Sequence, residues 1–343
     1  MDQVQVSRLT EAQASMDALR RRVGEIIVGQ NEVVEQVLWA ILAGGHVLLE
    51  GNPGLGKTLL VRTLAACLEL TFSRIQFTPD LMPSDITGTH VLMLDAQGRS
   101  TGRFELHKGP IFAQLVLADE VNRASPKTQS ALLEAMQEHA VTLAGQRHAL
   151  EEPFVVLATE NPIEMEGTFP LPEAQLDRFI LKVLVPTPGE DDLVSILSRT
   201  TGSPQQMPDP LLGARQLLDL RALCREIVVS EPVLRYAARL VAASSPEAPT
   251  SSESVRRAVR LGASVRGAQS LVTAAKARSL LAGRPHAGFE DIRAVAHPVL
   301  RHRILRSFEA EADGTSTDAI IATLLEHVPT VTGRVAAALS EAR

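Results

Sequence analysis

A glycine-rich segment between two apolar stretches constrains this chain more than any other feature. It matches the pattern G-x-x-x-x-G-K-[ST] and comprises Gly51, Asn52, Pro53, Gly54, Leu55, Gly56, Lys57 and Thr58. The short apolar run 47–49 before it is typical of a buried strand, and residues 59–68 after it carry leucines at helical spacing. A strand, a glycine-rich turn and a helix in this order predict a phosphate-binding loop in an α/β fold.

The residue types of this loop indicate its chemistry. Glycines let the backbone turn tightly, so that several N–H groups point at one anion. The helix that follows offers its positive N-terminus to the same anion. Lys57 can reach the β- and γ-phosphates of a nucleotide, and the hydroxyl of Thr58 can bind Mg²⁺. We therefore expect a nucleoside triphosphate and Mg²⁺ as ligands.

Further apolar runs in the first half of the chain predict the rest of a sheet. They cover residues 74–77, 115–118, 154–158 and 179–185. Short continuous apolar strands separated by helical patterns favour a parallel sheet that is covered on both faces. Two hairpins interrupt this alternation, one pairing 91–94 with 104–106 around Gly98 and Gly102, the other pairing 141–143 with 148–150 around Gly145. The sheet does not need them, so we interpret them as functional insertions.

The segment Pro186-Thr187-Pro188-Gly189 marks a break in the pattern. After one more helix and a polar loop over 200–210, only helical patterns follow, among them 265–281, 289–300 and 317–327. We therefore expect an α/β nucleotide-binding domain over residues 1–187, including an N-terminal helix, and a smaller all-α domain over residues 188–343.

Two acidic residues follow the predicted strand 115–118, about 60 residues after the phosphate-binding loop. Asp119 is expected to help hold the Mg²⁺ ion. Glu120 points elsewhere because it is the next residue, and it can polarise a water molecule for attack on the γ-phosphate. Acids at strand ends are also common as caps, but the spacing and the strand favour the catalytic interpretation.

Asn161 follows the predicted strand 154–158 and should emerge at the carboxyl edge of the sheet, where ligands bind in open α/β sheets. Its amide is suited to orient the attacking water. The alternative is an ordinary turn asparagine, since Pro162 is the next residue.

Composition excludes several other classes of protein. The net charge is −6 and aromatic residues make up only 3%, which argues against a basic or stacking surface for nucleic acid. The two cysteines, Cys67 and Cys224, are far apart and form no metal-binding pattern, so we expect buried, reduced thiols. The polar first 22 residues hold no apolar signal segment, and the apolar run 37–49 is too short for a membrane span. We therefore expect a cytoplasmic protein.

Taken together, these motifs resemble one family. The phosphate-binding loop and the segments LADEVNRASPKTQSALLEAMQE and ATENPIEMEGTFPLPEAQLDRF are similar to those of the MoxR family of AAA+ ATPases. The resemblance runs from about Ile26 to near the C-terminus. It implies an Mg²⁺-dependent ATPase with a helical lid, assembled as a homo-oligomeric ring, a hexamer in the family, with ATP between neighbouring subunits.

The resemblance also implies roles for individual residues. Asn161 matches the first sensor, Arg178 the arginine finger that acts on the adjacent subunit's nucleotide, and Arg266 the second sensor. Residues 27–30, with Val28 and Gly29, match the segment that lines the adenine. The chain has Val265 where family members often have proline, which affects the first turn of a lid helix rather than the chemistry.

For function, the resemblance implies a chaperone-like ATPase that remodels or matures a protein partner, or helps insert its metal cofactor. It suggests a partner with a von Willebrand factor A domain, contacted by the inserted hairpins. The alternative is a nucleotide-gated DNA motor or loader of a related AAA+ branch, which the net charge and the lack of an appended DNA-binding motif disfavour. A nucleotide-binding scaffold without activity would not need Glu120. Three features stay open. Arg123 suits either a contact between subunits or an ordinary ion pair, and the N-terminal helix either faces solvent or binds a partner. The arginines over 256–260 form a basic stretch of the lid, for which a solvated helix face is the favoured interpretation.

Overall fold

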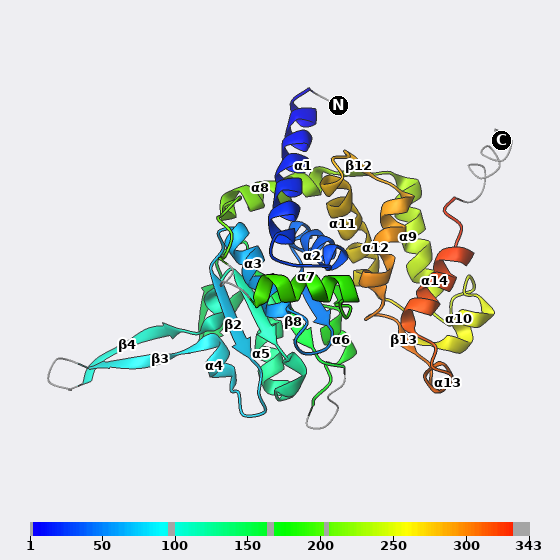
Figure 1. Cartoon of the computed structure of the whole chain (residues 1–343). Helices are drawn as coiled ribbons and strands as arrows, with labels where there is room; N and C mark the ends of the chain where they lie inside the picture. Colours follow the sequence, from blue (N-terminus) through cyan, green and yellow to red (C-terminus); the bar gives the residue numbers. More distant parts are fainter. Residues whose placement is uncertain (1–2, 95–99, 163–167, 202–205, 332–343) are drawn as a thin grey trace.

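The computed structural model describes residues 3–94, 100–162, 168–201 and 206–331. Its centre is a five-stranded parallel sheet in the order β2-β5-β8-β1-β9 (Figure 1). In chain order, the strands of this sheet are β1 (His46–Glu50), β2 (Phe72–Gln76), β5 (Leu115–Asp119), β8 (Val155–Glu160) and β9 (Phe179–Leu184). The five apolar runs expected as strands are therefore all strands of one sheet, and the prediction of an α/β fold is confirmed.

Alternate residues of these strands face two separate layers, as the two-residue period of a strand requires. Val47, Leu117 and Leu157 pack with α1 (Gln3–Gly24), α2 (Asn31–Ala43) and α3 (Lys57–Cys67). Leu48, Val116 and Val156 pack on the other side, with helices α4 (Pro83–Thr87) and α5 (Pro126–Glu138), and with the 3₁₀ turn η1 (Pro110–Phe112). Both faces of the sheet are thus buried, which explains why its strands are continuously apolar.

The N-terminal helix α1 is packed rather than solvated. Its buried stripe consists of Leu9, Ala12, Met16, Leu19 and Val23, and the helix contacts α2, α3 and α11 (Val265–Leu281). Arg20 forms ion pairs with Asp17 at 3.2 Å and with Glu35 at 3.7 Å. The apolar stripe of α1 is therefore explained by packing within the chain, and a protein partner is not needed to bury it.

Both expected hairpins are present. The first joins β3 (Gly88–Leu94) to β4 (Ser100–Lys108), with Leu92 opposite Phe104. Its turn, residues 95–99 with Gly98, lies outside the described residues. The second joins β6 (Ala140–Leu143) to β7 (Gln146–Ala149), and its turn uses Gly145 at φ +80°. The β3–β4 hairpin projects from the body as a long arm (Figure 1).

The second half of the chain is mainly helical. Its longer helices are α7 (Glu190–Thr200), α8 (Ala214–Glu226), α9 (Glu231–Ser244), α11, α12 (Phe289–Leu300) and α14 (Thr317–His327), and its short ones are α10 (Glu253–Ala258) and α13 (Phe308–Ala312). The expected bounds of α11, α12 and α14 are confirmed. The expectation of helices alone is wrong, because β10 (Val228–Val229) pairs with β12 (His286–Ala287), and β11 (Val259–Leu261) with β13 (Leu305–Arg306). Strands of two or three residues have no period for a sequence pattern to reveal.

One hydrophobic core continues from the sheet into the helical half, since Leu217, Leu271 and Val299 belong to the same cluster as Val47. The division at residues 187 and 188 therefore stays a prediction. Cys67 and Cys224 are buried and unbridged, as expected, and burial raises their pKa values to about 11 and about 12. Within the described ranges, no helix is both long and apolar enough to cross a membrane.

Candidate functional site

The phosphate-binding loop lies between the end of β1 and the start of α3, as predicted. Gly54 and Gly56 adopt φ values of +81° and +77°, and a Cβ at either position would meet nothing, so the left-handed backbone itself requires glycine. Gly51 is required for another reason: a Cβ there would lie 2.9 Å from the carbonyl oxygen of Val185. The tight loop leaves its backbone N–H groups and the first turn of α3 together at the carboxyl edge of the sheet.

Lys57 is the first residue of α3, and its Nζ donates to the carbonyl oxygen of Gly51 at 2.5 Å. Burial lowers its pKa, while the carboxylates of Asp119, Glu120 and Glu50 act in the opposite direction. These three acids lie close enough to raise the pKa of Lys57, although they come from different strands. The ammonium group is therefore already positioned over the loop where an anion would bind.

Asp119 ends β5 and is held on both carboxylate oxygens. Its Oδ1 accepts from the hydroxyl of Thr159 at 2.7 Å, and its Oδ2 accepts from Arg74 at 2.5 Å. The next residue, Glu120, turns into the left-handed region at φ +57° and donates its backbone N–H to the same Thr159 hydroxyl at 2.8 Å. Because of this change in backbone direction, the two carboxylates bind different partners, as we expected for adjacent residues.

The Glu120 carboxylate points toward β2 and the 3₁₀ turn η2 (Val121–Arg123). Its Oε2 lies 2.9 Å from Nε of Arg123 and 3.1 Å from Nε2 of Gln76, which donates to it. Of the two interpretations of Arg123, the structure shows the ion pair. Asn161 lies directly after β8, is buried, and occupies the carboxyl edge between β5 and β1 as expected.

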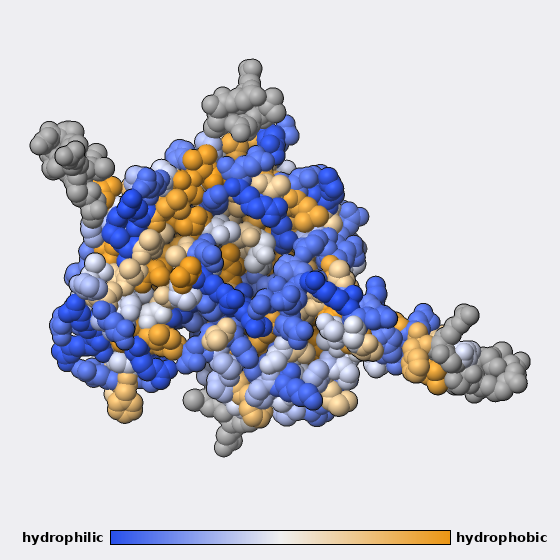
Figure 2. Space-filling view, turned by 180° about the vertical axis from the view of Figure 1, so that it is seen from behind, coloured by the Kyte–Doolittle hydropathy of each residue, from blue (hydrophilic) through white to orange (hydrophobic). Residues whose placement is uncertain are grey.

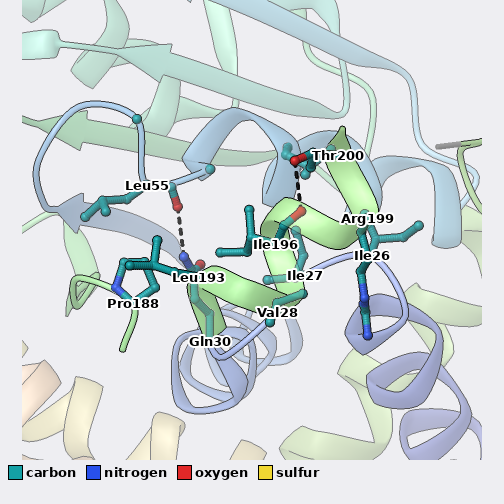
Figure 3. Close-up of a pocket in the computed structure, with 13 residues that line it drawn as sticks. Ile26, Ile27, Val28, Gln30, Leu55, Pro188, Leu193, Ile196, Arg199 and Thr200 are labelled. Carbon is teal, nitrogen blue, oxygen red and sulfur yellow. Dashed lines mark hydrogen bonds between the residues drawn. The ribbon is translucent and has the colours of Figure 1, made fainter. Parts of the chain in front are cut away.

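A pocket of about 180 Å³ opens beside the phosphate-binding loop (Figure 3). Its lining comes from three segments of the chain, namely Ile26, Ile27, Val28 and Gln30, then Gly54, Leu55, Gly56 and Leu59, and finally Pro188, Leu193, Ile196, Arg199 and Thr200. The lining is mostly aliphatic and lies at the phosphate loop, so it is suited to a flat nucleobase. Gln30 supports the loop, because its Nε2 donates to the carbonyl oxygen of Leu55 at 2.8 Å.

The family resemblance implies that Val28 lines the adenine, and in the structure Val28 lines the pocket beside the phosphate-binding loop. Gly29 is not among the lining residues; a Cβ on it would meet the carboxylate of Asp192 at 2.3 Å, so it allows α7 to approach. Helix α7 was missed as part of the site. The signal for it was present, since Leu193 and Ile196 directly follow the break at 186–189.

The two arginines with expected roles lie at the opposite edge of the sheet. Arg178 precedes β9, and Arg266 is in the first turn of α11. Both line a second pocket of about 340 Å³, together with Gly44 and Gly45, which precede β1. Strand β9 is parallel to β1 and has six residues. Because each residue of a strand adds roughly 3.3 Å, Arg178 is separated from the carboxyl edge by the whole length of β9. Neither arginine lines the pocket beside the phosphate-binding loop.

Comparison with known proteins gives a consistent result. Residues 46–181 match the ATPase family associated with various cellular activities (AAA), and residues 251–324 match the AAA lid domain. The chain is 41% identical to the chaperone MoxR1 of Mycobacterium tuberculosis over 318 residues, which cover 92% of this chain and 83% of that protein. It is 32% identical to the protein MoxR of Paracoccus denitrificans over 318 residues, 88% of this chain and 89% of the relative. A crystal structure of a proposed ATPase from Cytophaga hutchinsonii, 40% identical, matches with a TM-score of 0.87 over 95% of this chain and 98% of that one.

Proposed function

This chain belongs to the MoxR family of AAA+ ATPases, and from that membership we propose that it couples Mg²⁺-dependent ATP hydrolysis to the remodelling or maturation of a protein partner. Insertion of the partner's metal cofactor is one form that such maturation takes. The observation that carries the proposal is that the residues expected at an ATP site lie at two opposite edges of one sheet. The loop and acids lie at the carboxyl edge, and Arg178 and Arg266 at the amino edge.

The carboxyl edge fits ATP with Mg²⁺. The left-handed glycines, the start of α3 and Lys57 suit the phosphates, and the aliphatic pocket suits the base. Thr58 and Asp119 would hold the ion, which neutralises charge on the phosphates when bound. Glu120 would take the proton of the attacking water, and Asn161 would orient that water. This assignment uses the acid that ends β5, the acid that follows it and the asparagine that follows β8.

The amino edge fits a neighbour's nucleotide better than the chain's own. An arginine a strand's length from its own phosphate loop cannot stabilise the charge there. A second copy that docks its carboxyl edge onto this edge would place Arg178 and Arg266 beside its ATP. Such a head-to-tail contact closes into a ring when the rotation permits, and we propose a hexamer.

The β3–β4 hairpin is the surface that we assign to the partner. Its exposed apolar side chains are Val91 at 46%, Leu92 at 38%, Met93 at 40% and Phe104 at 67% of full exposure. They gather near the end of the arm, beside its grey tip in Figure 2. We propose a cytoplasmic partner with a von Willebrand factor A domain. The DNA motor or loader stays the second candidate, and the hairpin's apolar side chains argue against it, because DNA binding depends mainly on cationic contacts.

A capture experiment tests this function. The Glu120→Gln protein in ATP should enrich a protein with a von Willebrand factor A domain from the native cell lysate. The double variant Leu92→Ser/Phe104→Ser, which removes one cross-strand apolar pair, should lose the enrichment and still bind ATP. The double variant Leu234→Ser/Phe308→Ser, which removes two exposed apolar side chains from α9 and α13 outside both hairpins, is the matched control and should retain the enrichment. Enrichment of duplex DNA instead, lost as salt is raised, would overturn the proposal in favour of the second candidate.

A further inference from the structure

Arg303, three residues after α12, is a buried arginine that binds the start of β9. Its side chain is only 2% exposed, and burial lowers its pKa against the opposing effect of Asp177. Its Nε donates to Oδ1 of Asp177 at 2.7 Å. Its two Nη atoms donate to the backbone oxygens of Asp177, Phe179, Ile180 and Val299 and to the hydroxyl of Ser270. Every N–H direction of the guanidinium group is therefore used within the chain.

These contacts fix the backbone on both sides of Arg178. Nη2 of Arg303 donates to the carbonyl oxygen of Phe179 at 2.7 Å and to that of Asp177 at 3.3 Å. Arg178 stands between those two residues. Its own Nε is buried and finds no hydrogen-bond partner among the described residues. The hydrogen bonds of its two neighbours thus fix the backbone at Arg178, and its own Nε adds none within the described part of the chain.

Asp177 makes a second connection, to the helix that carries Arg266. Its Oδ2 accepts from the hydroxyl of Ser264 at 2.8 Å. The same hydroxyl oxygen caps α11 by accepting from the backbone N–H of Arg266 at 3.1 Å. One carboxylate therefore joins Arg303 on one oxygen to the start of α11 on the other. Arg178, Arg266, Asp177 and Arg303 all line the same pocket.

We propose that Arg303, Asp177 and Ser264 are positioning residues that hold Arg178 and Arg266 as one unit, so that both approach the nucleotide of the neighbouring subunit together. This rests on the proposed function, which gives the two arginines that nucleotide. The unit also ties the lid helices α11 and α12 to the amino edge of the sheet, so a shift of the lid displaces both arginines at once.

Ser264 allows a test that leaves the buried Arg303–Asp177 pair intact. Ser264→Ala removes a cap and the link to Asp177, whereas Ser316→Ala removes only a comparable cap, since Ser316 accepts from the N–H of Ala319 at 3.1 Å at the start of α14. We expect similar melting temperatures and ATP affinity for the two variants. The kcat of Ser264→Ala should fall by about 10- to 100-fold, because misplacing reacting groups by 1 Å can cost 10²-fold, with the KM for ATP unchanged. Ser264→Thr keeps the hydroxyl and should restore kcat.

Mixing subunits shows where the unit acts. Lys57→Ala subunits keep an intact amino edge, and Ser264→Ala subunits keep an intact carboxyl edge. A mixture should regain turnover, because some interfaces then combine the two intact edges. Two outcomes would overturn the positioning role and leave the proposed function standing. One is a mixture that regains no turnover. The other is a Ser264→Ala protein with the same kcat as Ser316→Ala while Arg178→Ala is inactive. If Arg178→Ala itself turns over at the wild-type rate, the assignment of the amino edge to hydrolysis is overturned, and the positioning role with it.

Discussion

Arg123 holds the carboxylate of Glu120 from three residues further along the chain, with Nε 2.9 Å from Oε2. Gln76 donates to the same oxygen from β2. A carboxylate engaged in this way has one oxygen less available to take a proton from water. The residue that we assign to water activation is therefore restrained by two neighbours, and the restraint is weak because the pair is partly exposed.

Releasing the restraint should raise the ATPase rate of the protein without its partner. A partly exposed ion pair contributes about 0.2–1 kcal/mol, so Arg123→Ala should increase steady-state turnover by roughly 1.4- to 5-fold. Arg256→Ala is a suitable control, because Arg256 lies on α10 and, among the described residues, its side chain hydrogen-bonds only the backbone oxygen of Pro249, before that helix, at 3.5 Å. A lower rate together with smaller assemblies in sedimentation would instead assign Arg123 to the contact between subunits.

Lys57 and Glu120 should give separable defects. Lys57→Ala removes a charged contact with the phosphates, so the Kd for ATP should rise by about 10- to 150-fold, in line with about 1.5–3 kcal/mol for a charge-assisted hydrogen bond. Glu120→Gln keeps the shape of the side chain and should bind ATP normally, while turnover falls by about 10²- to 10⁴-fold. Calorimetry and a phosphate-release assay measure the two effects. Wild-type turnover by Glu120→Gln would show that another group activates the water.

The phosphate loop, the individual strands and the acids at their ends were predictable because each depends on residues that are close in sequence. The G-x-x-x-x-G-K-[ST] pattern and the strand before Asp119 are local, and so are the bounds of α11, α12 and α14. The partners of these groups were not predictable. Thr159 reaches Asp119 from another strand, and Arg303 is 126 residues from Asp177. Such contacts depend on how strands and helices meet in space, and no spacing in the sequence encodes them.

Arg178 offers a test of the ring. Arg178→Ala should bind ATP and lose about 10³- to 10⁵-fold in turnover, the range measured for arginine fingers. Mixing it with Lys57→Ala subunits should recover activity, since in a random equal mixture about one head-to-tail interface in four joins the two intact edges. The ATPase assay should be run over a range of protein concentrations. A rate per subunit that is independent of concentration, from a protein that sediments as a monomer, would contradict a shared site.

His46, the first residue of β1, is buried in its neutral form. Its Nε2 donates to the carbonyl oxygen of Met136 at 3.0 Å, and its Nδ1 accepts from the backbone N–H of Val156 at 3.0 Å. A proton on Nδ1 would face that N–H, and burial opposes the charge as well. Burial lowers the pKa of His46 to about 4; the nearby charges of His139 and Arg221 also lower it, and Glu152 raises it.

This histidine should make the protein less stable as the pH falls below neutrality. Above pH 6.5 the imidazole is neutral in both the folded and the unfolded chain, so it has no effect on stability there. Between pH 6.5 and about 4 the unfolded chain binds the proton and the folded chain does not, so the free energy of unfolding falls by about 1.4 kcal/mol per pH unit from this group. The amide of His46→Gln does not titrate, and urea unfolding at pH 7, 6 and 5 should show a shallower loss for this variant than for the wild type. His327→Gln, on the exposed end of α14, should follow the wild type, and equal slopes for all three proteins would show that His46 is not the group responsible.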